Sequence, residues 1–161
     1  MNQLAQAFGS KFAENKSLLR IRRFEMGNHT FKVQVPLTSE YEAMMERIKI
    51  VDEQKVNEYY VDLTKELQAN KSELTEELGV VFEENDIKVQ GRSMRDTAKQ
   101  KYITENRIVE MIKLLVPEEG HSLETLTYAE VEELFPFPVQ LELIEHITET
   151  ISPSYKEIKG K

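Results

Sequence analysis

Histidines and paired carboxylates are the side chains of this chain that are best suited to metal binding or acid–base chemistry. The three histidines, His29, His121 and His146, fall in an expected turn, an expected loop and an expected helix, far apart in the sequence. None is part of an H-E-x-x-H run, whose spacing places two ligands on one face of a helix. We therefore expect ordinary surface or hydrogen-bonded histidines and no metal site.

The carboxylates occur mainly as adjacent pairs, which do not face each other on a helix. Two acids act as general acid and base only when their surroundings separate their pKa values. A solvated acidic surface is the better interpretation of these pairs, and glycine-rich phosphate loops and G-x-S-x-G elbows are absent from the sequence. We expect no catalytic residue and no cofactor, so the chain is not expected to be an enzyme. The pairs are Glu76-Glu77, Glu83-Glu84, Glu118-Glu119 and Glu132-Glu133.

The overall charge also restricts the partners. The 161 residues include 29 acidic and 21 basic side chains, for a net charge of -8. A negative field opposes binding to nucleic acid and to anionic membranes. The chain has no cysteine and no apolar run of the ~20 residues that a membrane helix needs, so we expect a cytoplasmic protein.

The elements that would position any functional residue begin with a hairpin at residues 20–35. Apolar residues alternate on both sides of Gly27-Asn28, a pair that tolerates the positive φ of a tight turn. Ser39 with Glu42 predicts a capping box at the start of a helix. That helix either ends near Val51 or continues to Tyr60.

Further elements follow from periodicity and from proline and glycine. We expect helices over 61–78, 93–116, from Thr127 to Leu134, and from Pro138 to 151, with a weaker second hairpin at 80–82 and 87–89. The predicted fold is an α+β domain, mainly a helical bundle, with an N-terminal antiparallel β-hairpin. The domain covers 20–152. Residues 1–19 are a segment that either docks on the domain or stays disordered until a partner binds, and 153–161 are a polar tail.

Five apolar residues are candidates for partner binding. Two sit in the helix break Phe135-Pro136-Phe137-Pro138, where aromatic rings either fill the core or, if exposed, anchor an interface. The others share a helical stripe with Ile48, for which the core is the main alternative to a partner groove. The candidates are Tyr41, Met44, Met45, Phe135 and Phe137.

A local basic patch also lies on the first hairpin. Its members are Arg20, Arg22, Arg23 and Lys32. Such charges protect an edge strand from aggregation. Docking of an acidic partner is the alternative.

Residues 24–42, FEMGNHTFKVQVPLTSEYE, resemble the opening of tail assembly chaperones of long-tailed bacteriophages. Those proteins begin with an aromatic hairpin, a glycine-centred turn and an x-Val-Pro-x-Thr-x-x-Glu start to a helix. The resemblance implies a protein of the host cytoplasm that keeps the tape measure protein soluble and helps recruit tail tube subunits, often made also in a longer, frameshifted form. It implies no catalytic residue. An acidic adaptor or inhibitor of a host protein is the alternative function, and self-association is left open.

Overall fold

The computed structural model describes residues 2–152, and contacts divide the chain into two compact units. Unit 1 combines the described residues up to Met44 with those from Ile108 onward, and unit 2 comprises Met45–Arg107. The predicted domain boundaries stay a prediction. The expected polar tail, 153–161, lies outside the described residues.

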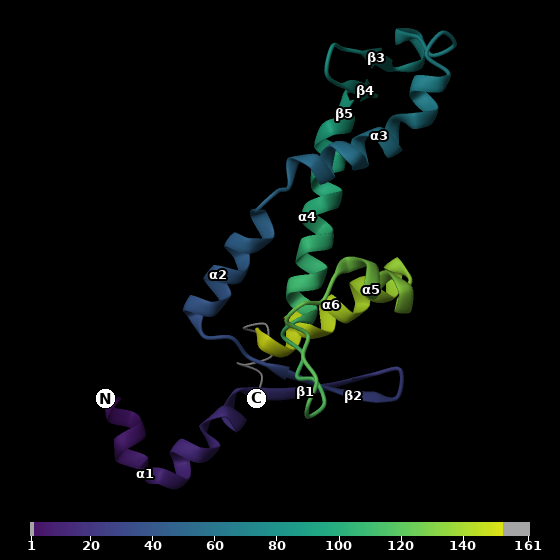
Figure 1. The fold of residues 1–161 in the computed structure, drawn as a ribbon. Coiled ribbons are helices and arrows are strands. Elements are labelled where there is room, and N and C mark those ends of the chain that lie inside the picture. The colour runs from purple at the N-terminus through teal and green to yellow at the C-terminus, as the bar shows by residue number, and fades with distance from the viewer. Residues whose placement is uncertain (1, 153–161) are drawn as a thin grey trace, which may run out of the picture. The chain divides into compact units, whose positions relative to one another are not determined.

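The predicted fold, one helical bundle with an N-terminal hairpin, is wrong in its arrangement. The α+β class and the abundance of helix fit, but the strands form two small sheets, of two and three strands (Figure 1). The hairpin is preceded by helix α1 (Gln3–Asn15) and the 3-10 helix η1 (Lys16–Arg20). The second sheet contributes core residues to unit 2, so it is part of that unit's framework.

Unit 1 is built around the hairpin of β1 (Ile21–Met26) and β2 (His29–Gln34). Gly27 and Asn28 have φ of 58° and 62°, which confirms the predicted tight turn. The paired rings of Phe24 and Phe31 stack with centroids 5.2 Å apart, and His146 of α6 (Phe137–Ile151) stacks on Phe24 at the same distance. This ring stack joins the hairpin to α6.

The outer edge of β2 is covered by residues that were expected to be helical. Helix α4 (Met94–Ile112) ends before Val116, because Leu114 accepts a hydrogen bond from the Gln34 N–H at 2.9 Å and the Val116 N–H donates to Lys32 at 2.8 Å. These bonds satisfy backbone groups that an edge strand would otherwise leave unpaired. The helix therefore ends earlier than Pro117 predicts.

Helix α2 (Thr38–Lys49) also begins earlier than predicted. The predicted capping box of Ser39 and Glu42 is wrong. Instead, the Leu37 carbonyl accepts the first helical hydrogen bond from Tyr41, at 2.9 Å, and the Leu37 N–H donates to the Glu40 carboxylate at 2.8 Å. Leu37 is therefore the N-cap residue of α2, and the carboxylate of Glu40, the third helical residue, bonds to its N–H.

Unit 2 contains α3 (Glu53–Ala69), the 3-10 helix η2 (Glu76–Leu78) and a sheet of β3 (Val80–Phe82), β4 (Ile87–Val89) and β5 (Arg92–Ser93) in that order. Its core joins α3 and the first turns of α4 to the sheet through Val56, Tyr60, Val80, Ile87 and Ala98. The second predicted hairpin is confirmed.

The predicted helix over 61–78 is wrong at both ends. Asp52 caps α3 through hydrogen bonds to the Gln54 and Lys55 N–H groups, at 3.0 and 3.3 Å, and the helix stops at Ala69. Asn70 follows as the C-cap, and its N–H bonds to the Glu66 carbonyl.

Candidate protein-binding surface

Two of the three histidines pack against aromatic rings of the first hairpin. His146 stacks on Phe24 and His29 contacts Phe31 edge-on at 4.6 Å. Among residues 2–152, no group of three histidine or carboxylate side chains is arranged to hold a metal ion. No helix of the same residues is long and apolar enough to span a bilayer. The candidate binding surface is formed by exposed apolar side chains instead.

That surface lies where α5 (Tyr128–Leu134) meets α6, a corner with defined geometry. The Thr127 hydroxyl accepts from the Glu130 N–H while the Glu130 side chain accepts from the Thr127 N–H, so the predicted capping box is confirmed. Phe135 ends α5, Pro136 is the N-cap of α6, and Pro138 lies within the first two helical residues. Proline suits this position because its missing N–H would have no helical partner.

Gln140 joins the two helices from inside the corner. Its side chain is 1% exposed. The amide nitrogen donates to the Phe135 carbonyl at 2.8 Å, and the amide oxygen accepts from the Tyr128 hydroxyl at 2.8 Å. A buried amide with both ends bonded fixes the angle between the segments that it joins.

Three large apolar side chains remain exposed around this fixed corner. Leu134 is the last residue of α5 and is 73% exposed; Phe137 and Leu141, one turn apart on α6, are 48% and 47% exposed. Their neighbours Val131, Leu143 and Ile147 are buried instead. We call Leu134, Phe137 and Leu141 the α5–α6 patch.

The patch lies on strongly acidic helices. Neither α5 nor α6 contains a lysine or arginine. Their glutamates are Glu130, Glu132, Glu133, Glu142, Glu145 and Glu149. An apolar centre with a charged surround is typical of protein-binding surfaces, and rigid aromatic side chains dominate their energetics.

The five predicted binding residues have different environments. Phe137 is exposed and Phe135 is half-buried at the corner. Tyr41 is 40% exposed, Met45 is half-buried, and Met44 is 2% exposed. Met44, like Ile48, is therefore a core residue and does not form part of a partner groove.

Two of the four basic residues of the first hairpin are engaged within unit 1. Arg20 donates to the Val35 carbonyl at 3.0 Å and pairs with Glu40, while Arg22 donates to the Thr150 carbonyl at 2.9 Å. The Leu37 N–H lowers the pKa of Glu40, and the Arg20 charge acts in the same direction. These bonds favour a structural role for Arg20 and Arg22.

Two residues of the α5–α6 patch were not singled out from the sequence as binding residues. Leu141 follows Phe137 by four residues, so the spacing of the two on one helical turn was a readable signal. Leu134 was assigned only to the short helix, and nothing local shows that its side chain faces outward.

No model of a protein family, no curated protein and no solved structure shows significant similarity to the chain. The resemblance of residues 24–42 therefore depends on the residues of that run alone.

Proposed function

We propose that this chain is a tail assembly chaperone of a long-tailed bacteriophage, acting in the host cytoplasm. In this proposal it binds the tape measure protein, keeps its apolar helical segments soluble and helps recruit tail tube subunits. The observation that carries the proposal is the α5–α6 patch, an exposed apolar surface held on a rigid corner and surrounded by glutamates.

The chemistry of the patch suits a helical client. An amphipathic helix presents apolar residues at three- and four-residue spacing, and Phe137 with Leu141 offers a matching pair at four-residue spacing. The surrounding glutamates favour a client whose apolar stripe is flanked by lysine or arginine. The net charge of -8 would keep the resulting complex soluble.

The hairpin supports the family assignment. The run that resembles these chaperones forms β1, the tight turn, β2 and the first residues of α2. The order of elements in this run is the order that the resemblance implies.

Co-expression with the tape measure protein of the same phage tests the proposal. The wild-type chain should raise the soluble fraction of that protein severalfold, and Phe137→Glu should remove most of the gain. Val61→Glu is the matched control, because Val61 is also an exposed apolar helical residue, at 54%, but lies on α3. Equal rescue by all three chains would exclude the patch, and no rescue by the wild type would exclude the function.

An acidic adaptor or inhibitor of a host protein is the second candidate, favoured by the glutamates of α5 and α6. It predicts capture of one host protein from lysate, and the loss of that capture in Phe137→Glu. The tape measure protein would then gain no solubility from co-expression.

A further inference from the structure

A second exposed apolar surface lies in the segment that precedes the hairpin. Neither α1 nor η1 contains a buried residue. Leu4, Phe8, Leu18 and Leu19 are 66%, 63%, 61% and 73% exposed. We call residues 2–20 the arm.

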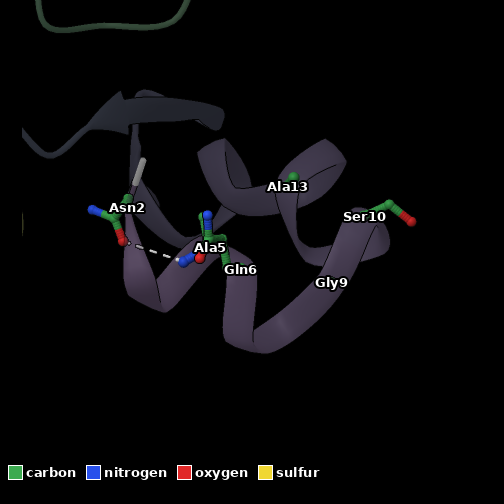
Figure 2. A pocket seen from close by; sticks show the side chains of 6 residues that line it. All are labelled: Asn2, Ala5, Gln6, Gly9, Ser10 and Ala13. Atoms are coloured by element: carbon green, nitrogen blue, oxygen red, sulfur yellow. Dashed lines mark hydrogen bonds between the residues drawn. The ribbon is translucent and has the colours of Figure 1, made fainter.

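The arm is shaped by a glycine. Gly9 has φ of 82° and ψ of -179°, a conformation that is essentially restricted to glycine, and it divides α1 into two helical pieces. Gly9 lies at this bend, as Figure 2 shows. An open hollow of about 370 Å³ beside the bend is lined by small and polar residues. The hollow holds no cluster of ionisable groups, so we assign no ligand to it. The rings of Phe8 and Phe12, on either side of the bend, lie 5.3 Å apart.

The charge of the arm is opposite to that of the rest of the chain. Lys11, Lys16 and Arg20 are its basic residues and Glu14 is its one acidic residue. Arg20 already pairs with Glu40, so the exposed Lys11 and Lys16 supply the positive charge that a partner would meet. The helices that carry the α5–α6 patch have glutamates and neither lysine nor arginine. An apolar, basic segment and an apolar, acidic surface are thus both exposed within unit 1.

We propose that the arm of one copy docks on the α5–α6 patch of a second copy, and that the second arm returns the contact to form an exchanged two-fold dimer. In the single chain, the arm and the patch both remain exposed. A second copy supplies each surface with its complement, and a two-fold axis satisfies both at once.

The area available is sufficient for a specific dimer. Seven exposed side chains take part in each contact, four from the arm and three from the patch. At on the order of 100 Å² for each, one contact buries about 700 Å² and two bury about 1,400 Å², within the range of standard interfaces. A single contact of about 700 Å² would fall well below that range, which is why the exchange of both arms matters.

Sedimentation velocity of the full chain at increasing concentration tests the dimer. The wild type should pass from the 18.8 kDa monomer to twice that mass. Phe8→Glu and Phe137→Glu should each weaken association at least tenfold, and Val61→Glu should leave it unchanged. Because Phe8 and Phe137 are both exposed, the far-ultraviolet circular dichroism of the variants should match that of the wild type.

Mixing the two weakened variants is the decisive measurement. The Phe137→Glu chain keeps an intact arm and the Phe8→Glu chain keeps an intact patch, so an equimolar mixture restores one contact. The mixture should associate more tightly than either variant alone and more weakly than the wild type. Raising sodium chloride from 50 to 500 mM should weaken the wild-type dimer, because salt screens the exposed charges.

A wild type that stays monomeric up to about 1 mM would overturn the proposal. That result is also the one expected if the arm docks on the patch of its own chain. A mixture that is no tighter than the single variants would overturn it equally. These outcomes are measured without a client protein, so failure of the dimer is distinguishable from failure of the proposed function. The arm of a second copy covers the patch that binds the client in the proposed function, so a client would have to displace it.

Discussion

Replacing Gln140 by methionine should destabilise unit 1 and loosen the α5–α6 corner. Methionine keeps the length and volume of the side chain but cannot donate to the Phe135 carbonyl or accept from the Tyr128 hydroxyl. Each hydrogen bond contributes about 1 kcal/mol net, and a buried carbonyl that loses its donor costs about 1–3 kcal/mol. The better burial of an apolar group offsets part of this loss, so we expect about 2 kcal/mol.

Urea denaturation followed by circular dichroism measures the effect. With an m value of about 2 kcal/mol/M, a loss of 2 kcal/mol lowers the midpoint by about 1 M. Gln100→Met is the matched control, because Gln100 lies in α4 and is exposed, so its midpoint should stay within about 0.2 M of the wild type. If Gln140→Met behaved like this control, the buried amide would not fix the corner.

Three further substitutions test local features of the fold. Asp86→Asn should cost about 2 kcal/mol at pH 7 in urea denaturation, because the carboxylate accepts from the Ser93 hydroxyl and from the N–H groups of Ile87 and Arg95. Burial alone would raise the pKa of Asp86, but these bonds and the Arg95 charge hold it below its usual value. The contribution is therefore full above about pH 4 and should disappear as the pH falls through the folded-state pKa, and a constant difference from pH 7 to pH 2 would contradict this. Thr127→Ala should lower stability by about 1 kcal/mol through loss of the α5 cap, measured by thermal unfolding, with Thr125→Ala as an uncapped control. Gly79→Ala should cost at least about 1 kcal/mol in the same assay, because Gly79 has φ of 82° and an added Cβ would lie 2.3 Å from the Gln90 amide nitrogen. Combining Gly79→Ala with Gln90→Ala should remove the clash but leave the cost of the positive φ.

Features determined by a few neighbouring residues could be predicted from the sequence. The Gly27-Asn28 turn, the Thr127 capping box and the helix break around Pro136 each depend on local backbone preferences, and the structure contains all three. The two strands at 80–82 and 87–89 follow from short apolar runs on either side of a polar turn.

Features determined by distant partners could not be predicted in the same way. The end of α4 depends on pairing between Val33 and Leu115, which lie far apart in the sequence. The third strand of the second sheet is only two residues long, Arg92–Ser93, and carries no periodicity. The start of α2 was missed because leucine is not a typical N-cap residue, and only the bond from the Leu37 N–H to the Glu40 carboxylate reveals the earlier start.

Only part of the candidate surface could be predicted from the sequence, for the same reasons. Phe137 was identified because a proline-flanked aromatic residue is visible in the sequence. The outward orientation of Leu134 and the role of Gln140 depend on how α5 turns into α6, which is fixed by the bond from Gln140 to the Phe135 carbonyl. Burial of Met44 depends on neighbours that the helical stripe alone does not specify.

The contacts between the hairpin and α6 have a consequence for synthesis on the ribosome. Arg22 bonds to Thr150 and Phe24 stacks on His146, so the first sheet meets its packing partner only after more than a hundred further residues have been translated. Unit 2, by contrast, is one continuous segment, Met45–Arg107, and all its core residues emerge before α6. At about 5–20 residues per second, the nascent hairpin waits roughly 6 to 25 seconds with its aromatic face uncovered. We therefore expect the sheet of β3, β4 and β5 to complete its packing first. The sheet of β1 and β2, although it is translated earlier, should complete its packing last.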